Sequence, residues 1–165
     1  MRENVLWIPS PNFRTPKPPR GITLIVLHAT ETAGIQSPLD WLRNKKSKAS
    51  AHYLIGKDGI VFQLVDEIDI TWHAGISAWK GQIAVNNFSI GIELVNLNNG
   101  KDSWPDDQIR SCARISAGIC KDHKLSADSI VGHFQISPGR KTDPVNFPWE
   151  DFHGKLINLG VGEAV

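Results

Sequence analysis

The sequence lacks the features that would place it in several large classes of protein. It has only two cysteines among 165 residues, no apolar stretch long enough to cross a bilayer, and a formal net charge of +1. Two cysteines are too few for a disulfide framework, and the missing apolar stretch excludes a membrane-spanning helix. The balanced charge provides no field for nucleic acid or for a membrane surface. A globular protein without nucleic-acid or membrane partners remains.

The two cysteines, Cys112 and Cys120, fall in a segment with helical periodicity. Their separation along a helix is about 12 Å, which is beyond the reach of a disulfide. We expect two buried, unreactive thiols, which leave the cellular compartment open. The N-terminus shows no apolar core of a secretion signal, so the sequence as given predicts a cytoplasmic protein. A periplasmic or envelope-associated protein trimmed of its leader would read the same.

The length of 165 residues is typical of one domain that folds as a monomer. Half of the ten prolines fall within residues 1–20, which predicts an extended arm without regular structure. Residues 21–158 are expected to form the catalytic domain, and residues 159–165 a flexible tail.

Apolar patterning predicts the secondary structure. The nearly continuous aliphatic run at 22–27 is typical of a strand buried on both faces of a sheet. Further strands are expected at 51–56, 60–65, 88–95 and 129–131, and helices at 38–46, 105–123 and 147–156. The long segment 66–87 breaks both patterns and is expected to be an irregular, functional loop. The fold class is therefore α/β, a single domain with a central mixed β-sheet flanked by helices.

Three polar residues lie at the ends of these strands or inside them, His28, Glu93 and His133, and two more, Lys141 and Asp143, lie on the loop after His133. Glu93 alternates with apolar neighbours, so its side chain should point to the opposite face of the sheet. Lys141 and Asp143 are two residues apart and would share one side of an extended loop. Taken singly, His28 has an ordinary interpretation as a strand-capping histidine, and the stretch with His133, Lys141 and Asp143 as a strand followed by a solvated basic loop.

Taken together, the five residues match the needs of a zinc hydrolase. Such a site uses three protein ligands with an open position for water, a general base, and a positive group for the developing oxyanion. The sequence contains no phosphate-binding glycine loop, no His-Glu-x-x-His helix and no Gly-x-Ser-x-Gly elbow. Because the ligands would be more than a hundred residues apart, their spacing alone does not decide the question.

Several motifs make the sequence resemble a known family. They are V-L-H-A-T at 26–30, S-A-H-Y-L-I-G-K-D-G at 50–59, W-H-A-G-I-S-A-W at 72–79, N-F-S-I-G-I-E-L-V-N at 87–96, V-G-H at 131–133 and G-R-K-T-D-P at 139–144. With them the chain resembles the zinc-dependent N-acetylmuramoyl-L-alanine amidases, in the branch of the AmpD-type recycling and AmiD-type envelope enzymes. Phage amidases and peptidoglycan recognition proteins are related to this family. The resemblance covers about residues 5–155.

The resemblance implies an activity and its residues. The enzyme would cleave the amide bond between N-acetylmuramic acid, or its anhydro form, and L-alanine in cell-wall turnover, recycling or lysis, with peptidoglycan or a muropeptide as partner. His28, His133 and Asp143 would bind one Zn²⁺ per chain. Glu93 would activate the water, and Lys141 would stabilise the transition state. The envelope type often carries a lipoprotein signal and a wall-binding domain, which this sequence does not show, so the resemblance leaves the compartment open.

Substrate contacts are expected from residues near these positions. Ala29 and Thr30 follow a ligand and resemble positions whose backbone meets the stem peptide, and Trp72 and His73 are expected to line the groove. His52 is either a buried core imidazole or a further substrate contact. Trp7, Trp41 and Trp149 are expected to pack in the interior.

Two other classes of protein remain open. A non-catalytic peptidoglycan-recognition module could share the fold, but in such modules a metal ligand is replaced, and here all three positions are filled. A structural zinc domain usually has four ligands and is rich in cysteine. Turnover of a muropeptide that chelation abolishes and zinc restores would separate the three.

Overall fold

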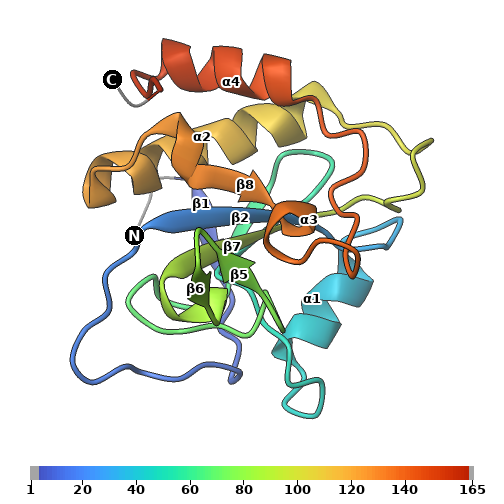
Figure 1. Ribbon diagram of the computed structural model, residues 1–165. Coiled ribbons are helices and arrows are strands. Elements are labelled where there is room, and N and C mark those ends of the chain that lie inside the picture. The colour runs from blue at the N-terminus through green and yellow to red at the C-terminus, as the bar shows by residue number, and fades with distance from the viewer. Residues whose placement is uncertain (1–3, 164–165) are drawn as a thin grey trace.

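A six-stranded mixed sheet forms the centre of the computed structural model, which describes residues 4–163 (Figure 1). Every neighbouring pair of strands is parallel except β3 and β4, which form an antiparallel hairpin. The predicted α/β class with a mixed central sheet is confirmed. In spatial order the strands are β1 (Val5–Trp7), β4 (Val61–Gln63), β3 (Tyr53–Ile55), β7 (Ser89–Leu94), β2 (Leu24–Ala29) and β8 (Ile130–Gly132).

Helices cover both faces of the sheet. The long helix α2 (Asp106–His123) and the last helix α4 (Trp149–Asn158) lie together on one face (Figure 1). Helix α1 (Gln36–Arg43) lies on the other. The short elements are the hairpin β5 (Ala78–Trp79) and β6 (Gln82–Ile83), the 3-10 helices η1 (Val85–Asn87) and η2 (Ala127–Ser129), and helix α3 (His133–Ile136). No helix within residues 4–163 is long and apolar enough to span a membrane.

The central strands are buried on both faces, and their alternation decides which residues face the site. In β7, Ile90, Ile92 and Leu94 pack into the core beneath α2 and α4. Successive side chains of a strand point to opposite faces, so Gly91 and Glu93 face the other side, as expected for Glu93. In β2 the same alternation places His28 on the face opposite Ile25 and Leu27.

Helix α2 confirms the helix predicted at 105–123. Its inner face buries nine residues, among them Ile109, Cys112, Ala113, Ser116, Ala117 and Cys120. Both cysteines are buried thiols outside any disulfide, and burial raises the pKa of Cys112 to about 12, which suits an inert thiol.

The N-terminal arm is more ordered than the prolines suggested. Strand β1 pairs in parallel with β4, so the prediction that residues 1–20 hold no regular element was wrong. The physical reason is that β1 precedes the first proline, Pro9, and keeps every backbone donor. Farther on, the arm is extended and fastened to the domain. The buried Asn12 donates from its side-chain Nδ2 to the carbonyl oxygens of Asn44 and Ala49.

The bounds of several other elements also differ from the predicted ones. Helix α1 spans Gln36–Arg43 rather than 38–46, and the segment 66–87 contains β5, β6 and η1 rather than only irregular chain. The predicted flexible tail begins too early, because Val161 is buried and the carbonyl of Gly162 accepts a hydrogen bond from the backbone N–H of Ala127. Ala164 and Val165 lie outside the described residues.

Candidate active site

The first two site residues come from the centre of the sheet. His28 on β2 and Glu93 on β7 are direct partners in the register of these two parallel strands. Paired residues of adjacent strands point to the same face, so both side chains project toward the side covered by α1. The backbone hydrogen bonds of the sheet therefore fix the placement of both residues.

His133 and Asp143 reach the same place from the edge of the sheet. His133 directly follows the edge strand β8, at a strand end as expected, and is the first residue of helix α3. The side-chain oxygen of Gln135 accepts a hydrogen bond from the backbone N–H of Gly132 at 2.8 Å and secures the start of this helix. Asp143 follows on the loop after α3, where its backbone carbonyl accepts a hydrogen bond from the N–H of Phe134.

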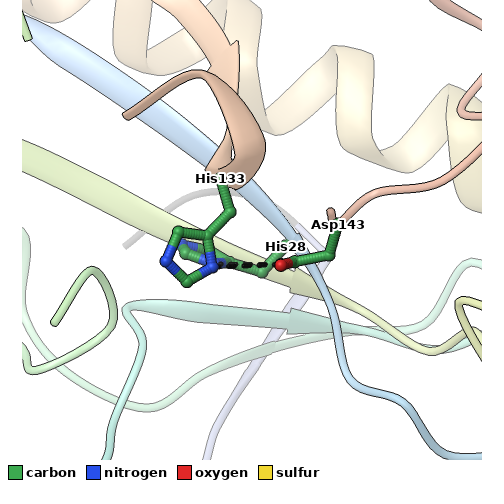
Figure 2. Close-up of side chains that lie close together, drawn as sticks. All are labelled: His28, His133 and Asp143. Atoms are coloured by element: carbon green, nitrogen blue, oxygen red, sulfur yellow. Dashed lines mark hydrogen bonds and ion pairs between the residues drawn. The ribbon is translucent and has the colours of Figure 1, made fainter. Parts of the chain in front are cut away.

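The three side chains point toward one another (Figure 2). His28 Nδ1 lies 2.9 Å from His133 Nδ1, and Asp143 Oδ2 lies 3.2 Å from His133 Nδ1 and 3.5 Å from His28 Nδ1. All three residues are buried, and together they form a group that could hold a metal ion. The predicted ligands are thus brought together from segments about a hundred residues apart.

The donor set fits a divalent metal. His133 Nε2 lies 3.3 Å from the carbonyl oxygen of Ala74, to which it donates, so the ring's lone pair is on Nδ1. Asp143 Oδ1 is buried and has no hydrogen-bond partner within the described chain. Burial lowers the pKa of His28 to about 4, so this imidazole is neutral near pH 7. Converging imidazole nitrogens and a carboxylate could hold a cation between them, and these are ligand types that zinc prefers.

Glu93 has the environment of a proton-transfer group. Burial, and then the charge of Asp143, raise the pKa of Glu93 to about 8. Its Oε2 atom is buried without a hydrogen-bond partner within residues 4–163. A carboxyl group that titrates near neutral pH can both take and return a proton.

A cavity of about 910 Å³ opens over these residues. Its lining includes all five predicted catalytic and metal-binding residues, Lys141 among them, and four of the five predicted substrate contacts: Ala29, Thr30, Trp72 and His73. This volume is typical of a site for a sizeable ligand.

The fifth, His52, does not line this cavity. It is fully buried. Its Nδ1 accepts a hydrogen bond from the backbone N–H of Gly91, and Nε2 lies 3.0 Å from the carbonyl oxygen of Asp69. Of the two alternatives left open for His52, the burial and these hydrogen bonds favour the core imidazole.

Trp41 is more exposed than predicted. It was expected to pack in the interior, but 57% of it is exposed and it lines the cavity from α1. Trp7 is also half-exposed, on the edge strand β1. The helical pattern of α1, with Leu39 and Leu42 turned inward, was the signal that could have placed Trp41 outside.

Comparison with known proteins identifies the family. Residues 17–146 match the family described as N-acetylmuramoyl-L-alanine amidase. The chain is 35% identical to the 1,6-anhydro-N-acetylmuramyl-L-alanine amidase AmpD of Haemophilus influenzae, over 88% of each protein. It is 34% identical to the N-acetylmuramoyl-L-alanine amidase AmiD of Escherichia coli, over 86% of this chain and 54% of AmiD, so it spans about half of that relative. The protein therefore belongs to the N-acetylmuramoyl-L-alanine amidase family.

Solved structures of AmpD and AmiD support the same fold and family. A crystal structure of an AmpD derivative superimposes with a TM-score of 0.82 at 26% identity and covers 96% of both chains. E. coli AmiD in complex with the substrate anhydro-N-acetylmuramic acid-L-Ala-D-γ-Glu-L-Lys gives a TM-score of 0.76 at 31% identity, over 90% of this chain and 62% of AmiD. The fold and the family assignment thus rest on both sequence and structure.

Proposed function

We propose that this protein hydrolyses the amide bond between N-acetylmuramic acid, or its anhydro form, and the L-alanine of the peptidoglycan stem peptide, with one zinc ion per chain. The observation that carries the proposal is the convergence of His28, His133 and Asp143 beside Glu93 in one cavity. The names of the AmpD and AmiD relatives and the substrate bound to AmiD support this substrate class.

Nδ1 of His28, Nδ1 of His133 and a carboxylate oxygen of Asp143 would hold the zinc. When bound, zinc supplies a Lewis acid that lowers the pKa of a coordinated water and polarises a carbonyl group. Three protein ligands leave a position open for this chemistry, as catalytic zinc sites require.

Glu93 acts as the general base and then as the general acid. Its carboxylate takes a proton from the attacking water as the water adds to the carbonyl carbon of the lactyl–L-alanine amide. The same carboxyl group then gives the proton to the leaving amine of L-alanine, so that the products are the sugar acid and a free stem peptide. A pKa of about 8, caused by burial, suits both steps near neutral pH.

Lys141 and the cavity walls complete the site. The ammonium group of Lys141 stabilises the negative charge that develops on the amide oxygen. Trp41 and Trp72 present apolar surfaces on which the sugar and the peptide rest, and Ala29 and Thr30 contact the stem peptide beside the ligand His28. Positioning of the amide against Glu93 is the main task of these walls.

The test is product analysis by mass spectrometry with anhydro-N-acetylmuramic acid-L-Ala-D-γ-Glu-L-Lys. We expect a free tripeptide and the anhydro sugar, loss of both products on chelation, and recovery with zinc. A parallel reaction with the intact muramic form decides which sugar is preferred. Binding of the muropeptide without any product would instead identify a recognition module.

Metal binding is tested separately with Asp143→Ala, which should lose zinc. Asp151→Ala, on the exposed face of α4, is a matched control that should keep it. Full zinc occupancy in Asp143→Ala would remove Asp143 from the ligand set.

A further inference from the structure

The ring of His73 lies between a metal ligand and the start of β7. Its Nδ1 is 2.9 Å from Nε2 of His28, and its Nε2 is 3.0 Å from the hydroxyl oxygen of Ser89. The hydroxyl of Ser89 in turn donates to the carbonyl oxygen of Val85 at 2.7 Å. Both nitrogens of His73 are therefore engaged inside the protein, which the expected substrate contact does not explain.

The donor and acceptor of each hydrogen bond in the series from His28 through His73 and Ser89 to Val85 can be assigned by starting at the carbonyl of Val85. A carbonyl oxygen only accepts, so the single hydroxyl proton of Ser89 points to Val85. The Ser89 oxygen must then accept the N–H of His73 Nε2. A buried, neutral imidazole has only one N–H, so His73 Nδ1 carries a lone pair and accepts from His28 Nε2.

The hydrogen bond from His28 Nε2 to His73 Nδ1 determines the tautomer of His28, the proposed metal ligand. With its proton on Nε2, His28 presents the lone pair of Nδ1 toward His133 and Asp143. A histidine can ligate a metal only through a nitrogen that carries no proton. The tautomer of His28 is thus set by His73 and Ser89, two residues outside the group of three proposed ligands.

We propose that the relay of Val85, Ser89 and His73 holds His28 in the tautomer and ring orientation that bind the metal, which makes His73 a positioning residue rather than a substrate contact. This inference rests on the metal site of the proposed function. The neighbouring residue serves the other histidine in the same way, because the carbonyl of Ala74 accepts from Nε2 of His133. Residues 73 and 74 therefore orient both imidazole ligands.

Two further features keep this segment in place. The side-chain oxygen of Asn86 accepts hydrogen bonds from the backbone N–H groups of both His73, at 3.2 Å, and Ala74, at 2.8 Å. A Cβ atom added at Gly91 would lie 2.4 Å from Cγ of His73, far inside contact distance. Only glycine at this position of β7 leaves room for the ring, which gives a physical reason for Gly91 inside a buried strand.

The test compares zinc affinity, by chelator competition, in variants of the full chain. Loss of a partner that orients a metal ligand typically costs about 10- to 100-fold in metal affinity. We expect that loss for His73→Leu, which removes the acceptor. His73→Asn places an amide oxygen near the position of Nδ1 and should restore most of the affinity. His153→Leu, a matched change on α4, should have no effect.

A second readout does not depend on zinc or on activity. Long-range proton–nitrogen NMR of the zinc-free protein reports which nitrogen of His28 carries the proton. We expect Nε2–H in the wild type and in His73→Asn, and a mixture of tautomers in His73→Leu. Ser89→Ala, a smaller change, should shift the tautomer of His73 itself and covers the case in which His73→Leu fails to fold.

The outcomes separate this inference from the proposed function. Wild-type turnover with unchanged zinc affinity in His73→Leu would overturn the relay and leave the amidase intact. Failure of His73→Asn to regain affinity would show that the acceptor is not what matters, and would also overturn it. If the wild type bound no zinc, the proposed function would fail, while the NMR result would still decide the relay.

Discussion

His28 and Glu93 stand side by side as direct partners of the parallel strands β2 and β7, with both side chains on the face of the sheet beneath the cavity. Adjacent strands are about 4.8 Å apart, so backbone hydrogen bonds set the spacing between the proposed metal ligand His28 and the proposed base Glu93. A site built on sheet residues holds its geometry better than one built on loops.

This pairing predicts separate effects on rate and on metal binding. Glu93→Gln keeps the length of the side chain and removes the base, so kcat should fall by about 10²–10⁴. Zinc content should stay at the wild-type value, because Glu93 is not among the converging ligand atoms. Steady-state kinetics together with metal analysis check this, and near-normal turnover would give the base role to another residue.

Lys141 should act mainly in the transition state. The amide oxygen gains negative charge only on the way to the tetrahedral state, so Lys141→Ala should lower kcat by about 10²–10³ and leave KM nearly unchanged. Lys121→Ala, an exposed lysine in the last turn of α2, is the control. A raised KM with unchanged kcat in Lys141→Ala would mean that Lys141 binds the ground state.

Trp41 should contribute to binding and little to chemistry. Covering part of this exposed ring with substrate removes apolar surface from water, worth on the order of 1–2 kcal/mol. Trp41→Ala should therefore raise KM by about 5- to 30-fold with kcat little changed. Trp7→Ala is the control, because Trp7 is 45% exposed but does not line the cavity. Equal KM values for both variants would contradict a role of Trp41 in the groove.

His52 should make the fold sensitive to acid. Burial, and then the charge of Arg20, lower the pKa of His52 to about 3, against 6.5 for an ordinary histidine. Below pH 6.5 the unfolded chain binds a proton that the folded protein does not take up, so the free energy of unfolding falls as the pH falls. One such group contributes a slope of up to about 1.4 kcal/mol per pH unit.

The check is chemical denaturation between pH 7 and pH 4. His52→Asn keeps an acceptor for the N–H of Gly91 and removes the titrating ring. Its unfolding free energy should depend less steeply on pH than that of the wild type, although it is less stable at pH 7. Parallel pH profiles for the two proteins would show that His52 does not titrate differently in the folded state.

The central strands and the long helix could be predicted from the sequence, because their apolar patterns are governed by burial. Glu93 was placed on the correct face because alternation in a strand depends only on the pleat. The ligand positions came from residue types at strand ends and from the family resemblance. Helix α3 was not predicted, since four residues are too few to show a helical period.

The histidines show where sequence reasoning stopped. His28, His52 and His73 are all buried, and nothing in their immediate sequence separates a ligand from a core residue. The difference comes from partners that the fold brings from other segments. Gly91 lies 39 positions from His52, and His28 lies 45 positions from His73. Trp41 was misplaced for a related reason, since an exposed tryptophan is explained only by the cavity beside it.

The positions of His28 and Asp143 in the chain have a consequence for the whole molecule. Between them lie α1, the β3–β4 hairpin, β7 and α2. Within the described sheet, the edge strand β8 pairs only with β2. An ion bound by these residues would act as a cross-link that closes this long loop, and the unfolded chain could not hold it. The melting temperature would then rise with the concentration of free zinc. Metal supply would then affect the thermal stability of the folded protein as well as its catalytic rate.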